Sequence, residues 1–380
     1  MNHYNAMGSV RVNINNELLL WAVQRAGYEK DQAEKSFPHL SSWLEGTKIP
    51  TKKQLEDFAR KFYVPFGYLM LQAPPEEVPI IPLFRGDNVT ALGNLNVLDT
   101  IHILSSRQGW LRDYLEENEY EELPFVGRYK NASVEELVKE IRNLLSIDEE
   151  WASLQSTPGA AVSYLANLIE DKGVAVEFNG VVGNSNKRRI EVSDCRGFVL
   201  VDTYVPFVFV NNNDSKRAQL FTLIHELAHV LIGYGSGYSS IDMESIQDSK
   251  ERLCNLVAAE FLVPNSYFSK YWKSQTDIVT ISKKSKASTI VVARRAYELG
   301  LLSKECLNEM YQHPFDADLP AKKKTSKGDF YRTLDRRLGS VFSTHIGNAI
   351  RSGQILYNEA YRLTGLYGNT FNKAFKLGMA

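Results

Sequence analysis

The sequence has few cysteines and no excess of charge of either sign. Its 380 residues include three cysteines, Cys195, Cys254 and Cys306, too few and too widely spaced for a disulfide framework or a zinc knuckle. Lys and Arg number 44 against 45 Asp and Glu, which gives a net charge of −1. This balance excludes a globally basic nucleic-acid coat and a strongly acidic tail protein. We therefore expect reduced thiols in a globular chain.

Long apolar runs are also absent. No stretch approaches the roughly eighteen consecutive apolar residues of a membrane-spanning helix. The first residues lack a basic start followed by an apolar core, so the sequence predicts no signal peptide and a cytoplasmic location, without a membrane partner. Apolar residues make up 44% of the chain, which is ample for burial, and the length predicts two or three domains.

Changes in composition divide the chain into four parts. Residues 1–73 have helical apolar spacing, 74–95 form a proline-rich linker, 96–315 mix helical and strand-like patterns, and 320–380 are helical again. Helices are expected near 97–115, 133–145, 159–168, 215–232, 249–262 and within 287–311, and strands near 174–178, 196–201 and 207–210. The predicted fold class is α+β, mostly α, with a small β-sheet.

One motif carries recognisable chemistry. His225 and His229 are four residues apart on a predicted helix, so both imidazoles can reach one small ion. Glu226 is the next residue of the helix after His225, and from there its carboxylate can hold a metal-bound water and accept a proton from that water. Zinc lowers the pKa of such a water to about 7, so Zn²⁺ is the expected cofactor and peptide-bond hydrolysis the expected reaction. The alternative is a core helix whose histidines only satisfy hydrogen bonds, but the apolar flanks would leave three polar side chains buried at a cost.

The third metal ligand is expected to be a carboxylate, since no histidine follows within eighty residues. The candidates are Asp242, Glu244, Asp248, Glu251 and Glu260. Glu251 and Glu260 are nine residues apart on one predicted helix and therefore face opposite ways. Glu251 is preferred, because Asn255 follows one turn later and can hydrogen-bond a histidine ligand.

Residues 221–229 and 251–264 together resemble the ImmA/IrrE family of gluzincin-type metallopeptidases. The strand ending at Asn211 and Arg217 at the start of the next helix fit the same pattern, and the similarity covers roughly 80–315. The resemblance implies a zincin-like core with Glu251 as third zinc ligand and a strand edge beside the cleft on which an extended substrate adds. Tyr234 and Tyr238 are the candidate transition-state donors, against the alternative that they are surface loop aromatics.

Members of that family cleave repressors of the helix-turn-helix kind. The resemblance therefore implies a zinc endopeptidase that makes site-specific cuts in a cognate repressor or antitoxin, in phage immunity, mobile-element control or a stress response. The alternative is a non-proteolytic regulator of the toxin–antitoxin type that binds DNA or a partner through a zinc-stabilised core.

The N-terminal part resembles a degenerate Cro/C1-type helix-turn-helix of the same family's fused branch. Gly46 would cap a short recognition helix, and Thr51 with Gln54 signals the start of the next one. The segment 34–42 is about three residues shorter than an ordinary turn plus recognition helix, and Pro38 restricts where that helix begins. Lys and Arg exceed Asp and Glu by only nine to seven over residues 1–73, so DNA binding and protein docking are both left open.

The C-terminal part is basic. Residues 320–380 contain eleven Lys and Arg against three Asp and Glu, with aromatic residues interleaved. Either the aromatics form the core of a helical subdomain, or the surface binds nucleic acid or an acidic partner. The candidate binding residues are Lys322, Lys323, Lys324, Lys327, Arg336 and Arg337.

Overall fold

The computed structural model describes residues 10–76, 91–235, 237–238, 248–312 and 330–377, which form two compact units. The smaller unit contains α1 (Asn16–Arg25), α2 (Lys30–Ser36), α3 (His39–Leu44), α4 (Lys52–Lys61), the 3-10 helix η1 (Phe66–Met70) and the start of α5 (Ala91–Glu117), up to Leu98. The larger unit begins at Asp99. Each unit is described by itself.

The smaller unit is all-helical, as the sequence predicts. Thr51 caps α4: its hydroxyl accepts from the Gln54 amide, and the Gln54 side chain accepts in return from the Thr51 N–H at 2.9 Å. Gly46 has φ of +70° and follows the end of α3, where glycine tolerates the left-handed conformation. Only Phe37 and Pro38 separate α2 from the six-residue α3. The predicted helix start and helix end are therefore confirmed, and the element between α2 and α4 is short.

The larger unit combines one sheet with many helices, which confirms the predicted α+β, mostly α, class. Its strands are β1 (Ala175–Asn179), β2 (Gly197–Leu200), β3 (Phe207–Asn211) and β4 (Gly237–Tyr238). Its helices after α5 are α6 (Val134–Leu145), η2 (Trp151–Leu154), α7 (Pro158–Glu170), α8 (Lys216–Ile232), α9 (Ser249–Leu262), α10 (Asn265–Tyr271), η3 (Gln275–Asp277), α11 (Ile278–Ser285), α12 (Thr289–Glu298), α13 (Lys304–Gln312), α14 (Phe330–Leu338), α15 (Ser340–Ser352), α16 (Tyr357–Thr364) and α17 (Gly368–Ala374). None of the helices in the described residues is long and apolar enough to cross a membrane.

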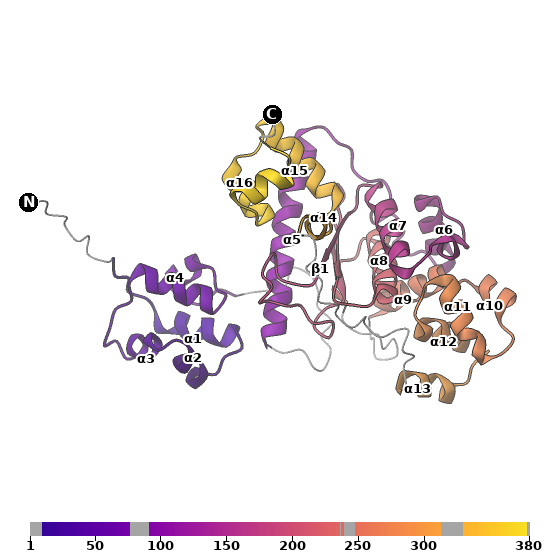
Figure 1. Cartoon of the computed structure of the whole chain (residues 1–380), viewed down its shortest axis with the longest axis horizontal. Helices are drawn as coiled ribbons and strands as arrows, with labels where there is room; N and C mark the ends of the chain where they lie inside the picture. Colours follow the sequence, from indigo (N-terminus) through magenta and orange to yellow (C-terminus); the bar gives the residue numbers. More distant parts are fainter. Residues whose placement is uncertain (1–9, 77–90, 236, 239–247, 313–329, 378–380) are drawn as a thin grey trace, which may run out of the picture. The chain divides into compact units, whose positions relative to one another are not determined.

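The four strands lie in the order β1-β3-β2-β4. β1 runs parallel to β3, whereas β2 is antiparallel to both β3 and β4. Side chains alternate between the two faces of the central strand β3. Val208 and Val210 join the core formed with α7 and α8, whereas Phe207 contacts the ring of Phe342 from α15. The sheet is consequently covered on both faces, with α7 and α8 on one side and α5, α14 and α15 on the other (Figure 1).

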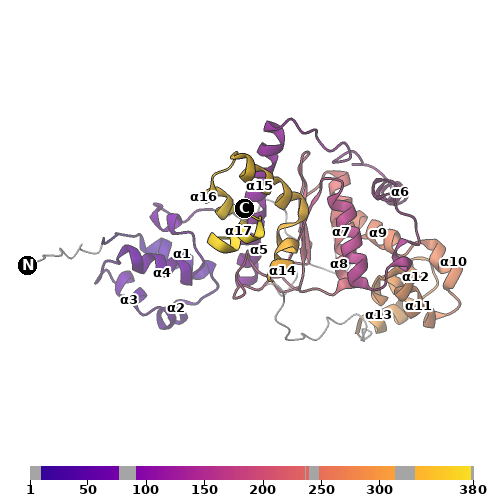
Figure 2. The same cartoon turned by 45° about the horizontal axis from the view of Figure 1, so that its top comes forward.

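The helix α8 runs through the core of this unit. Ser215 caps its first turn by accepting from the Ala218 N–H, and Gly233 ends it with φ of +71°. A Cβ atom at Gly233 would lie 2.7 Å from the Cα of Gly127, so only glycine fits this close crossing. α9 packs along α8, and α6 packs on α9 (Figure 2). A helix buried on almost every side can hold polar groups only where they have a partner or a ligand.

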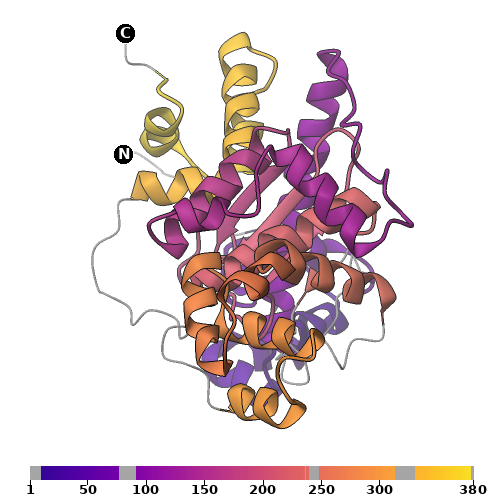
Figure 3. The ribbon, with the colours of Figure 1, turned by 90° about the vertical axis from the view of Figure 1, so that its right-hand side faces the viewer.

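The last four helices form a group on the far side of the sheet. The guanidinium of Arg107 on α5 donates to both carboxylate oxygens of Glu177 on β1, at 2.7 and 2.6 Å, and to the carbonyl of Leu363 on α16 at 2.8 Å. These buried contacts join α16 to α5 and, through Arg107, to β1. Figure 3 shows the helices of residues 249–312 (orange) lying apart from those of 330–377 (yellow).

Candidate metal centre

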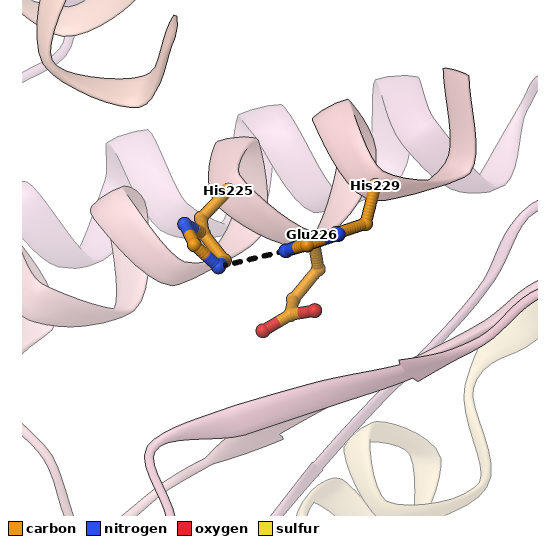
Figure 4. A group of neighbouring side chains, drawn as sticks. All are labelled: His225, Glu226 and His229. Atoms are coloured by element: carbon orange, nitrogen blue, oxygen red, sulfur yellow. Dashed lines mark hydrogen bonds between the residues drawn. The ribbon is translucent and has the colours of Figure 1, made fainter. Parts of the chain in front are cut away.

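Three polar side chains of α8 point to one place in the core. His225, Glu226 and His229 are all fully buried, and each offers a ligand atom within 4.8 Å of those of the other two. The two imidazole Nε2 atoms lie 3.1 Å apart, and Figure 4 shows the Glu226 carboxylate directed from the same helix toward the neighbouring strand. The spacing predicted from the sequence is therefore realised in the fold.

The helix α9 brings a carboxylate to the two histidines. One oxygen of Glu251 lies 3.2 Å from Nε2 of His225, and the other lies 3.2 Å from Nε2 of His229. Ligands placed about 2.0–2.2 Å from a tetrahedral zinc ion lie about 3.3–3.6 Å from one another. The two imidazole nitrogens and the two oxygens of Glu251 are close to that separation, and two imidazoles with one carboxylate form a donor set that zinc prefers. The residues present fit a zinc ion.

The rival carboxylates have other partners. Glu260, also on α9, is paired with the guanidinium of Arg295. Asp248 caps α9, where it accepts from the Lys250 N–H at 2.7 Å and from the Tyr234 hydroxyl at 2.8 Å. Asp242 and Glu244 lie outside the described residues. Glu251 is thus the candidate that reaches the histidines within the part of the chain that the structure describes.

Glu226 is placed to act on a group bound there. Neither of its carboxylate oxygens has a hydrogen-bond partner among the described residues, although both are buried. A bare carboxylate in the core is costly unless a ligand completes its surroundings. Gly197 on β2 faces it: a Cβ added to Gly197 would lie 3.3 Å from Oε1 of Glu226. The missing side chain of Gly197 therefore lets the backbone of β2 approach the carboxylate closely.

The electrostatics of the four residues suit a cation. Burial lowers the pKa of His225, which favours the neutral imidazole that binds metal. Burial alone would raise the pKa of Glu251, but its contacts with His225 and His229 outweigh this and hold the pKa below its usual value. Burial, with the Glu251 carboxylate next in effect, raises the pKa of Glu226 well above its ordinary range. A divalent cation in the centre would oppose that rise and favour the ionised form of Glu226.

Asn255 lies one turn after Glu251, as the sequence suggests. Its side chain is fully buried, and the amide acts to raise the pKa of His225, as Glu251 also does. This position is suitable for orienting a histidine ligand.

The two tyrosines are placed differently from each other. The ring of Tyr234 stacks on His229 with centroids 5.9 Å apart, but its hydroxyl donates to Asp248. That hydrogen bond, with burial, raises the pKa of Tyr234 to about 12. Tyr238 lies on β4, where its backbone pairs with Gly197. Tyr234 thus lies beside the centre, but its hydroxyl donates its hydrogen bond to Asp248.

The candidate binding residues of the C-terminal part divide into two groups. Lys322, Lys323, Lys324 and Lys327 lie outside the described residues. Arg336 is half-buried, with its guanidinium 4.5 Å from the ring centroid of Phe178 on β1, and Arg337 approaches Asn184 at 3.4 Å. The two arginines contribute to holding α14 on the sheet.

The aromatic residues of this part are partly core and partly surface. Phe342 and Phe371 are fully buried, whereas Tyr357 and Tyr367 are 52% and 66% exposed. The helices therefore have a core of their own and also leave aromatic rings at the surface.

Two features of the centre are absent from the sequence-based interpretation. Gly197 borders Glu226, and a glycine inside a strand pattern is a recognised sign of close backbone approach, so a signal was present. β4 is only two residues long, too short for any alternation to be detected, and forms the edge of the sheet next to β2. Within the described residues, β4, which follows α8, lies at the edge of the sheet next to Gly197, whereas the upstream strand β3 lies inside the sheet.

Part of the larger unit is similar to a known peptidase domain. Residues 170–297 match the family model of the IrrE N-terminal-like domain, Peptidase_M78. This stretch contains the whole sheet, α8 and α9, and the match makes it a domain of metallopeptidase type. The matched part is shorter than the 80–315 covered by the resemblance. Residues 338–376, which include α15–α17, match a domain of unknown function, DUF8813. No protein of curated function matches the chain significantly.

Proposed function

We propose that this protein is a zinc-dependent endopeptidase that cuts a regulatory protein at a specific site. The observation that carries the proposal is the arrangement of His225, His229 and Glu251, whose donor atoms lie 3.1–3.2 Å apart in the core beside the bare carboxylate of Glu226. Zinc bound there supplies Lewis acidity, polarising a peptide carbonyl and making water acidic enough to lose a proton near pH 7.

The chain's own residues supply the rest of the chemistry. His225, His229 and Glu251 hold the ion, and Asn255 orients the first histidine. Glu226 takes the proton of the attacking water and later gives it to the leaving amine. β4 has no strand partner on its outer side among the described residues, so an extended segment of substrate can pair with it.

We further propose a repressor or antitoxin as the substrate, within phage immunity, mobile-element control or a stress response. General proteolysis does not require the smaller unit or helices α14–α17. In this proposal they bind the substrate away from the bond that is cut, and this binding determines which protein is cleaved. The smaller unit then serves to bind DNA or a partner protein as a degenerate helix-turn-helix. We expect cleavage of one cognate regulator at an exposed linker and negligible turnover of casein.

Glu226→Gln tests the proposal against a non-proteolytic regulator. The variant keeps the size of the side chain but cannot accept the proton, so we expect zinc content and fold to be unchanged and cleavage to fall by about a thousandfold. The measurement is co-expression with candidate helix-turn-helix regulators, followed by mass spectrometry of the fragments. If the regulatory output persists unchanged in the zinc-loaded variant, the protein acts without proteolysis.

A further inference from the structure

The last two helices, α16 and α17, are joined in the manner of a helix-turn-helix. Residues 365–367 separate them, and the helices of that motif are joined by a turn of about three to four residues that often contains glycine. Gly365 begins the turn with φ of +67°, and its N–H donates to the carbonyl of Tyr361 at 2.8 Å. Glycine adopts this left-handed conformation without steric cost. The connection therefore has the length and the backbone geometry of the motif.

The two helices pack on each other through aromatic side chains. The ring of Phe371 on α17 meets that of Tyr361 on α16 edge to face, with centroids 4.7 Å apart. Leu366 in the turn is 2% exposed. A Cβ atom added to Gly347 on α15 would lie 3.6 Å from the ring of Phe375, so the end of α17 also packs on α15. Helices α15, α16 and α17 thus form a three-helix group around a core of their own (Figure 2).

The turn of the motif is attached to the rest of the larger unit. The side-chain amide of Asn184 donates to the carbonyl of Gly365 at 3.0 Å, and the buried guanidinium of Arg107 donates to the carbonyl of Leu363 at 2.8 Å. Recognition by side chains is precise only when a rigid element holds them in place. These contacts hold the first helix and the turn, and α17 extends from them.

The second helix has one apolar and one polar face. Phe371 and Phe375, four residues apart, are both buried. Asn369 and Lys373 are also four residues apart, are both exposed and therefore share the opposite face, with Lys376 exposed just after the helix. Among the described residues, neither lysine has an acidic partner. Amide side chains read the edges of bases and ammonium groups contact phosphates, so this face combines both kinds of contact.

The charge of the three-helix group favours a polyanion. Residues 340–377 contain four Lys and Arg against one acidic residue, Glu359, and four minus one gives a net charge of +3. All four cations are exposed: Arg351, Arg362, Lys373 and Lys376. Glu359 lies 3.6 Å from Arg362, which leaves the cations around α17 uncompensated. A cluster of cations around an exposed helix of this motif is the electrostatic pattern of a nucleic-acid-binding surface.

We propose that α16 and α17 bind duplex DNA, with the exposed face of α17 in the major groove. Asn369 contacts a base edge, while Lys373 and Lys376 contact phosphates. The inference goes beyond the proposed function and does not depend on it. It gives the larger unit a DNA-binding element separate from the smaller unit, and the other faces of α14–α17 remain available to the substrate protein.

The test uses the zinc-loaded full chain and short, fluorescently labelled DNA duplexes of random sequence, with binding followed by anisotropy. We expect the affinity to fall about a hundredfold between about 50 and 200 mM salt, as the release of counterions from three or four phosphate contacts requires. Duplex RNA of the same length should bind about tenfold more weakly or less, because side chains cannot enter its deep, narrow major groove.

Loss of two cations provides the variant. Lys373→Gln combined with Lys376→Gln should weaken duplex binding about tenfold or more and reduce the slope of log affinity against log salt by about two. Lys139→Gln combined with Lys304→Gln is the matched control, because it removes the same charge from exposed positions of α6 and α13. The control should keep the slope of the wild type. All four positions are exposed, so unfolding by urea should be the same in both variants.

Readout of bases is tested with Asn369→Ala. Duplexes are first enriched from the random pool by repeated selection on the wild-type chain. The variant should bind the selected sequence about tenfold more weakly and the random pool as tightly as before, since only a base contact is lost. An equal effect on both pools would contradict a base contact at this residue.

Unchanged duplex binding in the Lys373→Gln, Lys376→Gln variant, equal weakening in the control, or absence of duplex binding at low salt would overturn the assignment. Polyglutamate that binds more tightly than DNA, and is lost in the same variant, would assign the surface to an acidic protein instead. The proposed function is judged separately: Glu226→Gln should bind duplexes like the wild type, and its loss of cleavage decides the peptidase proposal whatever the duplexes do.

Discussion

The carboxylate of Glu260 is paired with the guanidinium of Arg295. Arg295 is 8% exposed and also contacts Glu298 and the side chain of Asn265, both at 2.8 Å. This network holds α12 against the end of α9 and occupies the one other carboxylate on α9 that rivals Glu251 as a ligand. The two glutamates of α9 therefore have separate tasks, one facing the histidines and one joining two helices.

The first prediction concerns these two glutamates. Glu251→Ala removes one of three ligands and should reduce bound zinc at least tenfold, whereas Glu260→Ala should leave the zinc content at one ion per chain. Glu260→Ala should instead lower the free energy of unfolding by about 1–2 kcal/mol, because Arg295 keeps only part of its partners. Metal analysis and urea unfolding of both purified variants decide this. Equal zinc loss in the two variants would contradict the ligand assignment.

The second prediction concerns metal removal. Without an ion, burial and the nearby carboxylate of Glu251 raise the pKa of Glu226 and disfavour its ionised form, whereas an ion would attract both carboxylates. A ligand that binds only the folded state stabilises it, so a chelator should lower the melting temperature and added zinc should restore it. The Glu251→Ala variant is the control, since its melting temperature should respond little to either treatment. A wild-type melting temperature that is insensitive to chelator would exclude a structurally coupled ion.

The third prediction contrasts two glycines. Gly197→Ala would place a Cβ atom 2.3 Å from Thr222 and 2.8 Å from the carbonyl oxygen of Phe209, so it should lower the free energy of unfolding by about 1–3 kcal/mol. Gly109 lies exposed in α5, with nothing within 4 Å of an added Cβ. Gly109→Ala should therefore raise stability by about 0.4–1 kcal/mol. Chemical denaturation of both variants measures the two changes, and the same sign in both would refute the close approach of β2 to α8.

The fourth prediction concerns pH. Burial, with Arg336 nearby, lowers the pKa of Lys216 to about 8. Its ammonium donates to the neutral side chains of Asn212 and Gln219. Because the folded-state pKa lies below the unfolded value near 10.4, the stability associated with Lys216 is present above the unfolded value and is lost as pH falls through 8. Lys216→Gln should thus be more stable than wild type at pH 7, by about 1 kcal/mol once the solvent-exposed part of the side chain is allowed for.

The measurement is the free energy of unfolding of wild type and variant between pH 7 and 10. The advantage of Lys216→Gln should shrink as pH rises above 8. Lys139→Gln, at an exposed position of α6, is the control and should show no such trend. An advantage independent of pH would indicate that the ammonium is already well solvated.

Local sequence signals determined the elements and the reactive side chains. The four-residue spacing of His225 and His229 needs only one turn of helix to bring both imidazoles to one side, and Thr51 with Gln54 marks a helix start by contacts three residues apart. The alternation of valine and phenylalanine in residues 207–210 likewise follows from the pleat of a strand. Interactions of this kind join residues that are close in the chain, so they can be predicted from the sequence alone.

Tertiary structure decided everything that joins distant segments. Helical periodicity shows that Glu251 and Glu260 face opposite ways. The packing of α9 on α8 decides that Glu251 meets the histidines, and Arg295 from α12 pairs with Glu260. The edge position of the two-residue β4 and the contact of Gly197 with Thr222 depend in the same way on which strands pair. From the sequence alone, Arg336 is expected to be an exposed charge. In the structure its guanidinium lies over the ring of Phe178, because α14 packs on β1. Such contacts are fixed by the burial of apolar faces between segments far apart in the chain, and no local pattern encodes the partner.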